Sequence, residues 1–480
     1  MDGRLPADSV EVQVSREEQQ AQALHSAALL DLRAGDTKRA VERLKKATRL
    51  SPSFAQAHNH LGVALGMLGD TEAAVKPFAA ASELDAEFSD AHLNLGAALK
   101  ALGQNAAAAV AYQRALATSP ENEEARVELA RLWVSLEKQD RALRALEDPP
   151  GLPASAHLAL HRGLVWRQTA DLAAAEAEFR RSAQLDPDNL LAQNNLGCLL
   201  RETGRAKEAT DVLRRAVALQ PSHAAAQLNL GVAQLANAQP AEALDTLRRS
   251  LELQPGQTLA LALKALAHQE LGQAPLAREL VDFDRFLFQK RVSGVEDLPA
   301  LNAALSRHVQ EHPTLVADPS AQATRDGLHS GNLLAEPKGP VQVLERLIRS
   351  AIAEYVASLA GQSAHPFLQA RPEQAELQAW GVVLGSGGHQ LPHIHPRAWL
   401  SGVYYAQVPD ASQLASEQSC LEFGRPPADY PLQAAPRLRF VRPEPGLLVL
   451  FPSYFYHRTI PFEQHATRVS IAFDVSPAGT

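Results

Sequence analysis

A repeat with a period of 34 residues constrains the fold of this chain more than any other feature of its sequence. A small residue recurs in steps of 34, with a single step of 33, at Ala28, Gly62, Gly96, Ala130, Gly163, Gly197, Gly231 and Ala265. An alanine follows twelve residues after each of them, at Ala40, Ala74, Ala108, Ala142, Ala175, Ala209, Ala243 and Ala277. A period of this length predicts helix pairs that stack on one another, because one pair alone cannot bury its apolar face.

Glycine and proline mark the ends of the predicted helices. A glycine lies seven residues after five of the small positions, at Gly35, Gly69, Gly103, Gly204 and Gly272. Five units end in proline, at Pro52, Pro120, Pro187, Pro221 and Pro255. Glycine ends the first helix of a pair and proline stops the second, while the small residues let the two helices cross closely. The segment EDPPGLPASAH (147–157) replaces a short turn, so we expect a kink or loosened stacking there.

Two blocks of the repeat region, AQAHNHLGVALGMLGDTEAAVKPFAAASELD and LAQNNLGCLLRETGRAKEATDVLRRAVALQP, resemble the tetratricopeptide repeat family closely. The resemblance implies an α-solenoid whose concave groove binds a protein or peptide. Asparagines recur on the first helix of several units and could hydrogen-bond an extended backbone in that groove: Asn59, Asn94, Asn194, Asn195 and Asn229. The alternative is that these amides solvate the inner face or bridge neighbouring repeats.

Charge and composition argue against several other classes of protein. The net charge is −8 and no run of Lys or Arg dominates a segment, so we expect no nucleic-acid partner. The polar start of the sequence is unlike a secretory signal, and no run of about 18 apolar residues occurs, so we expect no membrane partner. The two cysteines, Cys198 and Cys420, lie far apart without a CxxC partner, which fits a reducing, cytoplasmic compartment.

The composition changes at about residue 281, where we place a domain boundary. We expect a frayed or disordered N-terminus over residues 1–19, about eight repeats over 20–280, and a second domain over 281–480. In the second domain, apolar residues at helical spacing predict helices over 298–312 and 341–360. Alternating patterns predict seven short strands, at 376–384, 400–408, 420–424, 438–443, 446–452, 459–463 and 468–475. Such strands with Pro and Gly turns favour a double-sheet roll of the cupin type.

Histidines in the strand-rich region form a candidate metal site. His393 and His395 are one residue apart on an extended segment, so both side chains can bind one ion. A buried strand then leads to His457, and Arg468 follows eleven residues later. Non-haem iron needs three protein ligands on one face, with the other positions open. Arg468 can bind a far carboxylate bidentately.

Four motifs in this order resemble the putative 2OG-Fe(II) oxygenase family: HIHP, SGVYY, FPSYFYH and RVSIAF. The resemblance implies a double-stranded β-helix that uses Fe(II), 2-oxoglutarate and dioxygen to oxidise a C–H bond, releasing succinate and carbon dioxide. It implies metal ligation by His393, His395 and His457. Residues expected to bind the cosubstrate are Arg468, Ser470, and whichever of Tyr404 and Tyr405 faces inward.

One position departs from the wider superfamily, because His395 stands where a carboxylate is usual. Three alternatives stay open. The three histidines bind the iron together, or Glu422 supplies a carboxylate from another strand, or His395 only orients the site and water completes it. His389, in a Gly-rich bend, is expected to lie behind the ligands or to face the substrate.

The sequence therefore predicts a multidomain α + β protein, with an α-solenoid followed by a double-stranded β-helix with flanking helices. The leading hypothesis is an iron- and 2-oxoglutarate-dependent dioxygenase of the hydroxylase type whose repeats recruit a protein or peptide. A small metabolite is a further possible substrate, with the repeats serving assembly. The alternative from another class is a scaffold protein with a catalytically degenerate cupin-like domain.

Overall fold

The computed structural model describes residues 15–317, 323–335, 337–361, 365–410, 412 and 414–478. Most of the segment expected to be frayed, residues 1–14, lies outside this range, whereas residues 16–19 belong to the first helix. The chain divides into two compact units, Met1–Ala192 and Gln193–Thr480, and each is described by itself. Repeat helices occur in both units, so the expected boundary at residue 281 stays a prediction.

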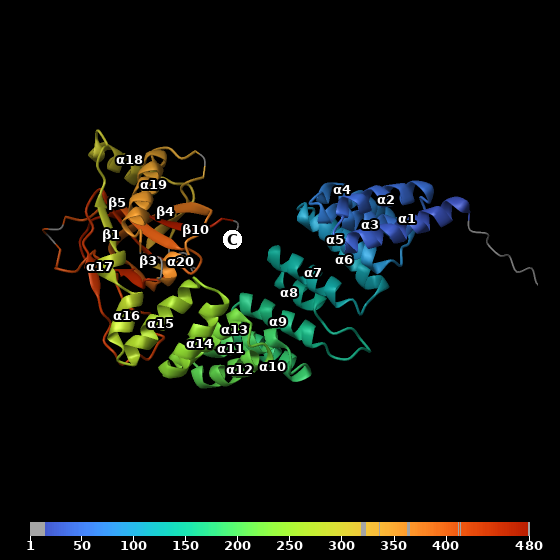
Figure 1. Cartoon of the computed structure of the whole chain (residues 1–480), viewed down its shortest axis with the longest axis horizontal. Helices are drawn as coiled ribbons and strands as arrows, with labels where there is room; N and C mark the ends of the chain where they lie inside the picture. The colour runs from blue at the N-terminus through green and yellow to red at the C-terminus, as the bar shows by residue number, and fades with distance from the viewer. Residues whose placement is uncertain are drawn as a thin grey trace, which may run out of the picture. The chain divides into compact units, whose positions relative to one another are not determined.

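The first unit consists of antiparallel helix pairs that stack side by side (Figure 1). Its helices are α1 (Arg16–Arg33), α2 (Thr37–Leu50), α3 (Ala55–Met67), α4 (Thr71–Leu84), α5 (Ser89–Ala101), α6 (Asn105–Thr118), α7 (Glu123–Ser135), α8 (Gln139–Ala145), α9 (Ala156–Gln168) and α10 (Leu172–Leu185). The helical repeat predicted from the 34-residue period is therefore confirmed.

Where the small residue of a unit is glycine, it lies against a large side chain of the following helix. A Cβ added to Gly62 would lie 2.6 Å from the ring of Phe78, and one added to Gly163 would lie 2.5 Å from the ring of Phe179. Phe179 is fully buried. The two helices of a pair thus approach until a ring fills the space that a side chain would need.

The turn between the two helices of a pair adopts the same left-handed backbone in every unit. Five units have glycine there, with φ between 70° and 82°. In the other three, Glu137, Ala170 and Ala238 occupy the position with φ of 57°, 60° and 54°. This conformation costs an L-residue about 1–2 kcal/mol, so the repeat architecture imposes it even where the sequence lacks glycine.

The irregular segment after the fourth pair is ordered by a buried arginine and an aspartate. Helix α8 has only 7 residues, and α9 begins at Ala156. Asp148 accepts a hydrogen bond from the backbone N–H of Ser155 and pairs with Arg181 at 2.9 Å. Arg162 donates to the carbonyl of Leu146 at 2.7 Å. These contacts fix the course of the long connection.

The second unit contains the remaining repeat helices and the β domain. Its repeat helices are α11 (Leu190–Glu202), which begins at the division, α12 (Ala206–Leu219), α13 (Ala224–Ala236), α14 (Pro240–Leu253), α15 (Thr258–Glu270) and α16 (Ala274–Leu280). The other helices are α17 (Phe283–Phe286), α18 (Leu298–Gln310), α19 (Val341–Ser358) and α20 (Pro366–Gln369). Among the described residues, every helix is too short or too polar to cross a bilayer.

The β domain is an antiparallel, curled sheet in two layers. Its strands are β1 (Phe288–Arg291), β2 (Val316–Ala317), β3 (Thr324–Asn332), β4 (Ala375–His393), β5 (Leu400–Gln407), β6 (Leu421–Phe423), β7 (Arg439–Val441), β8 (Leu447–Pro452), β9 (His457–Thr459) and β10 (Arg468–Pro477). They are ordered β1-β8-β5-β10-β4-β9-β6-β7, with β3 on β4 and β2 on β3. The first half of β4 pairs with β10 and its last residues pair with β9. This long strand therefore joins the two layers of the roll.

The expected strands differ from the observed ones in two ways. The strand predicted over 459–463 was placed too late, because β9 is His457–Thr459 and pairs with the end of β4. Strands β1, β2 and β3 were not predicted. β1 pairs with β8, Phe288 opposite Leu450, and its place depends on a partner far along the chain.

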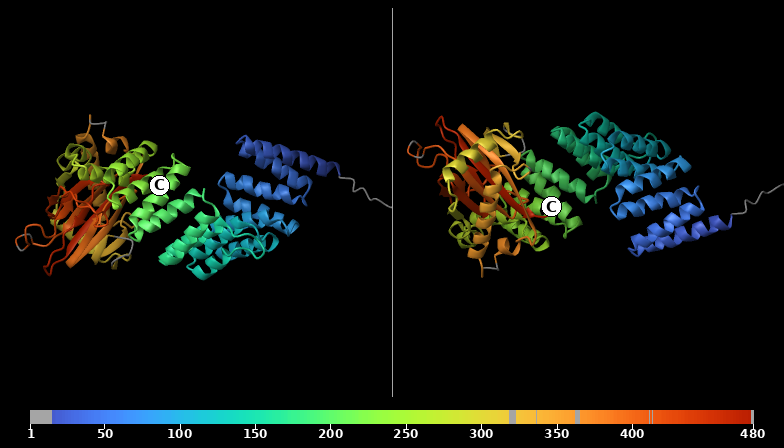
Figure 2. Two further views of the ribbon diagram at one scale, coloured as in Figure 1. Left: turned by 90° about the horizontal axis from the view of Figure 1, so that it is seen from below. Right: turned by 90° about the horizontal axis from the view of Figure 1, so that it is seen from above.

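One apolar core joins the last repeats to the sheet. A single buried cluster includes Leu261 and Leu266 of α15, Phe286 of α17, and Leu448 and Ile471 of the sheet. Figure 2 shows the yellow-green helices of the last repeats lying against the orange and red strands in both views. The last repeats and the β domain consequently form one packed body.

Candidate metal centre

Strand pairing brings the three histidines of the sequence motif together. His393 is the last residue of β4 and lies directly opposite His457, the first residue of β9. His395 follows in the connection to β5, where its backbone N–H donates to the carbonyl of Ser453 at 3.0 Å. Two segments more than sixty residues apart in the sequence are therefore fixed side by side by backbone hydrogen bonds.

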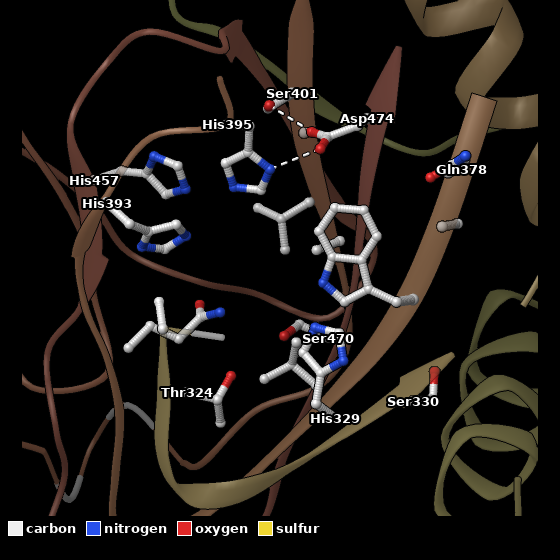
Figure 3. Close-up of a pocket in the computed structure, with 18 of the residues that line it drawn as sticks. Thr324, His329, Ser330, Gln378, His393, His395, Ser401, His457, Ser470 and Asp474 are labelled. Atoms are coloured by element: carbon white, nitrogen blue, oxygen red, sulfur yellow. Dashed lines mark hydrogen bonds and ion pairs between the residues drawn. The ribbon is translucent and has the colours of Figure 1, made fainter. Parts of the chain in front are cut away.

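The three imidazoles face one another in the pocket. One possible ligand atom from each of His393, His395 and His457 lies within 4.8 Å of the other two. The ring centroids of His393 and His457 are 4.3 Å apart, and those of His395 and His457 are 5.1 Å apart. Figure 3 shows the rings gathered on one side of the cavity. Their donor atoms are close enough to meet at a single ion.

The same nitrogen is engaged in all three rings. Nδ1 of His393 donates to the carbonyl of Leu391 at 2.7 Å, and Nδ1 of His457 donates to that of Phe455 at 2.9 Å. Nδ1 of His395 donates to Oδ2 of Asp474 at 2.7 Å. With the proton held on Nδ1, each Nε2 keeps a lone pair, which is the arrangement that outer hydrogen bonds impose on metal-binding histidines.

The environment also keeps two of these rings neutral. Burial, followed by the neighbouring His395, lowers the pKa of His393 to about 3. Burial is likewise the main cause that holds the pKa of His457 well below its ordinary value, with His393 and His395 adding to it. Neutral imidazole is the form that binds a metal ion, so no proton has to be displaced from these two rings at neutral pH.

Asp474 is a residue that the sequence reasoning did not single out. Its Oδ2 accepts from His395, and its Oδ1 accepts from the hydroxyl of Ser401 at 2.6 Å (Figure 3). Asp474 lies six residues after Arg468 on β10, and both line the pocket together with Ser470 and Ala472. The alternation of a strand puts such residues on one face, and this signal could have found Asp474 from the sequence.

Glu422, the sequence-derived candidate for a carboxylate ligand, points elsewhere. Its side chain is 1% exposed and bonds Arg458 at 2.9 Å and Arg425 at 2.5 Å. Its neighbours on β6 alternate with it, so Leu421 lines the pocket and Glu422 does not. The carboxylate of Asp474, by contrast, bonds Nδ1 of His395 from behind.

The pocket extends from the histidines to a buried arginine. Its volume is about 980 Å³, and Arg468, Ser470, Tyr405 and Thr324 are among the lining residues. The guanidinium of Arg468 is 2% exposed, lies 4.9 Å from the ring centre of Tyr405, and donates to the carbonyl of Ser419 at 2.8 Å. Burial lowers the pKa of Arg468 and raises that of Tyr405.

Three buried polar atoms of pocket-lining residues have no hydrogen-bond partner within the described part of the chain. They are Nε of Arg468, the hydroxyl of Tyr405 and Oγ1 of Thr324. Figure 3 shows Thr324 on the side of the cavity opposite Asp474. An unpaired buried donor costs about 1–3 kcal/mol, so these atoms fit a ligand that brings acceptor oxygens. Together with three imidazoles, they match the chemistry of a metal-chelating keto acid with a second carboxylate.

The structure separates the remaining candidates from this pocket. Tyr404 faces away from it and donates to Oδ1 of Asn302, so Tyr405 is the inward residue of the pair. His389 is half-buried, and its Nδ1 donates to the carbonyl of Gly387 at 3.0 Å, outside the residues that line the pocket. The sequence expectation that His389 faces the substrate finds no support in this geometry.

The repeat asparagines bond one another across adjacent repeats. Nδ2 of Asn94 donates to Oδ1 of Asn59 at 3.0 Å in the first unit. Nδ2 of Asn229 donates to Oδ1 of Asn194 at 2.9 Å in the second unit. The neighbouring Asn195 is half-buried. These bonds agree with the alternative that the amides bridge neighbouring repeats, and a role in holding a partner stays a prediction.

The fold and the site together define a class: helical repeats joined to a two-layered β roll with a histidine-lined pocket. Known families match both parts. The tetratricopeptide repeat family matches residues 25–91, 99–157 and 194–258, and the family described as Putative 2OG-Fe(II) oxygenase matches residues 378–474. The chain therefore combines tetratricopeptide repeats with a domain of the putative 2OG-Fe(II) oxygenase family. Among curated proteins, no sequence matches this chain.

Solved structures similar to this chain include several repeat proteins. A tetratricopeptide repeat protein from Parabacteroides merdae is 17% identical, with 52% of this chain and 99% of that chain covered and a TM-score of 0.39. Yeast Tom70 is 19% identical, with 57% and 59% covered and a TM-score of 0.42. YrrB, described as having an unusual peptide-binding site, is 22% identical, with 47% and 98% covered and a TM-score of 0.30.

Proposed function

We propose that the β domain is an Fe(II)- and 2-oxoglutarate-dependent dioxygenase of the hydroxylase type. The observation that carries the proposal is the convergence of three imidazoles, each held by Nδ1, in a pocket that ends at buried Arg468. When bound, Fe(II) and 2-oxoglutarate supply dioxygen activation coupled to decarboxylation, which oxidises a C–H bond and yields succinate and carbon dioxide.

The chain's own residues would divide the work as follows. His393, His395 and His457 bind the metal through Nε2, and Asp474 keeps the ring of His395 oriented. Arg468 receives the far carboxylate of the cosubstrate through its unpaired Nε.

Other residues would shape the cavity around these groups. Ser470, 4% exposed and on the same face of β10, adds a hydroxyl donor near the guanidinium. Leu421, Val403 and Phe451 give the pocket apolar walls, which exclude water from the reacting groups.

We further propose that the repeats recruit a protein or peptide. The pocket of about 980 Å³ is at the upper end of the range for small-ligand sites, so it can hold a substrate side chain beside the cosubstrate. Repeat arrays present extended concave surfaces, which suits a peptide substrate better than a small metabolite. The cytoplasm as the compartment stays a prediction from the sequence.

A spectroscopic comparison of two histidine variants tests the proposed chemistry. Under anaerobic conditions, Fe(II) with 2-oxoglutarate should give a weak visible charge-transfer band that His457→Ala abolishes. His389→Ala is the matched control, because this histidine lies outside the pocket, and it should keep the band. In air, the wild-type protein should release succinate and His457→Ala should not.

The same experiment can overturn the proposal. A wild-type protein without the band and without succinate release would favour the scaffold with a degenerate β domain. An equal band in His457→Ala would place the metal elsewhere.

A mass measurement tests the recruitment of a peptide. A peptide captured by the iron-loaded chain should gain the mass of one oxygen atom when 2-oxoglutarate and air are supplied. An unchanged mass would contradict the proposal that the repeats deliver a peptide substrate.

A further inference from the structure

Helix α15 of the last repeat is packed into the core of the β domain. Leu261, Leu263 and Leu266 of this helix are buried in the same apolar cluster as Leu450 of β8 and Phe455, which precedes β9. The helix is 13 residues long, and a helix of this length spans about 20 Å. It is therefore a stiff element inside the body that carries the candidate metal centre.

The first residue of α15 contacts the segment that carries His395. The hydroxyl of Thr258 donates to the carbonyl of Pro396 at 2.6 Å, across 138 residues of sequence. Thr258 is 7% exposed, whereas Pro396 is exposed, so the bond is buried only on the side of the helix. Pro396 follows His395 directly and has no N–H of its own. Two backbone bonds also hold this segment, because the N–H of His395 donates to the carbonyl of Ser453 at 3.0 Å and the N–H of Ala398 donates to the carbonyl of His395 at 3.2 Å. Thr258 adds a restraint at the carbonyl of Pro396.

The last residues of α15 hold the loop that leaves the strand beside His457. The carboxylate of Glu270 accepts the backbone N–H of Gln433 at 2.9 Å and that of Ala434 at 2.8 Å. The side chain of Gln269 donates to the carbonyl of Ala435 at 2.6 Å. A carboxylate that accepts two N–H groups forms strong, charge-assisted bonds. This loop is thereby clamped to the end of the helix.

The clamped loop connects β6 to β7, and β6 is the strand that pairs with His457. Phe423, the last residue of β6, is directly opposite His457 in the sheet. The next residue, Gly424, donates its backbone N–H to the carbonyl of Tyr456 at 2.8 Å. A shift of the loop would therefore be transmitted to the strand that carries the third histidine.

We propose that α15 positions the metal centre, with Thr258 and Glu270 acting as positioning residues for the two ligand-bearing segments. The inference rests on the proposed function, because it takes the three histidines as metal ligands. At its start, this helix contacts the segment that carries His395. At its end, it contacts the loop after β6, the strand that pairs with His457. A partner that displaces this helix would change the distance between the ligands, so the repeats and the metal site are mechanically coupled.

The test uses cobalt(II) as a probe of the full-length protein, with affinity measured by titration and geometry by the visible absorption of the bound ion. Thr258→Val removes the hydroxyl at nearly constant volume, and Glu270→Gln leaves one acceptor for two N–H donors. Each variant should weaken cobalt(II) binding about tenfold, which is the lower end of the loss seen when a residue behind a metal ligand is replaced. Each should also alter the absorption band of the bound ion. Thr258→Ser keeps the hydroxyl, so it should bind cobalt(II) with wild-type affinity and a wild-type absorption band.

Two matched controls make the same chemical changes away from the site. Thr246→Val removes a hydroxyl that donates within α14 to the carbonyl of Glu242, and Glu252→Gln neutralises an exposed partner of Arg248. Both should keep wild-type cobalt(II) affinity and spectrum. A merely structural role of α15 would lower the unfolding temperature of Thr258→Val and Glu270→Gln but would leave the band of the bound ion unchanged.

The outcomes separate this inference from the proposed function. If the wild-type protein binds no cobalt(II), the metal centre itself fails. If the wild type binds the ion, while Thr258→Val and Glu270→Gln bind it with unchanged affinity and spectrum, the metal centre stands and the positioning role of α15 is wrong. A loss in both Thr258→Val and Glu270→Gln supports the role, provided that Thr258→Ser and the two controls keep the wild-type affinity and spectrum.

Discussion

Nδ1 of His395 donates to Oδ2 of Asp474 over 2.7 Å, although 79 residues separate the two in the chain. The second oxygen of Asp474 accepts from Ser401, so the carboxylate is held in place on both sides. Under the proposed function, this pair accounts for a histidine at the position where a carboxylate was expected from the sequence. The negative charge of Asp474 lies behind the imidazole of His395.

The Asp474→Asn variant tests this pair. Replacing the charge by a neutral amide makes the ring of His395 a poorer donor to a metal and loosens its orientation. We expect cobalt(II) affinity to fall about tenfold or more, as for other groups behind metal-binding histidines. Titration of both proteins measures this, with Asp245→Asn at an exposed site as the control. Equal affinity would mean that Asp474 plays no part in holding the site.

The Arg468→Lys variant separates cosubstrate binding from metal binding. Lysine keeps the charge but loses the planar fork and the unpaired Nε. We expect 2-oxoglutarate to bind more weakly by about 2 kcal/mol or more, roughly 30-fold, while the affinity for Fe(II) changes little. Anaerobic titration of the iron-loaded protein with 2-oxoglutarate measures the loss. Arg439→Lys, on the edge strand β7, is the control, and an unaltered response in Arg468→Lys would refute the assignment.

The left-handed turns of the repeats predict a stabilising substitution. Ala170 has φ of 60°, a conformation that costs an L-residue about 1–2 kcal/mol and glycine almost nothing. We expect Ala170→Gly to raise the free energy of unfolding by about 1 kcal/mol. The same change at Ala177, exposed within α10, should lower it by about 0.5–1 kcal/mol. Denaturant titration followed by helical circular dichroism measures both, and a destabilised Ala170→Gly would contradict the backbone assignment.

His161 predicts how the repeats respond to acid. Burial, followed by the nearby His157, lowers the pKa of His161 to about 4 in the folded state, against about 6.5 for an unperturbed histidine. Between these values the unfolded chain binds a proton that the folded chain does not. The stability from this group is therefore complete above about pH 6.5 and is lost as the pH falls towards 4.

The measurement for His161 is the pH dependence of unfolding by urea. The slope of stability against pH between 6.5 and 4 should be smaller in His161→Gln than in the wild type. His465→Gln, at an exposed histidine of the β domain, should leave the slope unchanged. An identical slope in His161→Gln would show that this imidazole is not shielded from water.

Features that depend on neighbouring residues could be predicted from the sequence. The register of the repeats follows from small residues at fixed spacing, because the glycines among them accommodate a large side chain such as Phe78 or Leu213. Helices α18 and α19 begin at the first residues of the predicted segments. The candidate site could also be located from the sequence, because His393 and His457 come after predicted strands and Arg468 begins one.

Features that depend on distant pairing could not be predicted in this way. Strand β3 is short of apolar alternation and owes its conformation to β4, with Leu328 opposite Val383. Glu422 was chosen as the nearest candidate carboxylate on another predicted strand, but only the structure shows that two arginines hold it on the other face. The shared core of α15 and the sheet has no local signal, because it depends on how two sequence regions pack.

The central claim is that the imidazoles of His393, His395 and His457 bind one ferrous ion. The most direct measurement is an anomalous-difference map at the iron absorption edge from crystals grown anaerobically with Fe(II) and 2-oxoglutarate. We predict a single peak at about 2.1 Å from Nε2 of all three rings, with Asp474 bonded to His395 and not to the ion. A peak bound by Glu422 or Asp474 directly, or by only two of these histidines, would contradict the account.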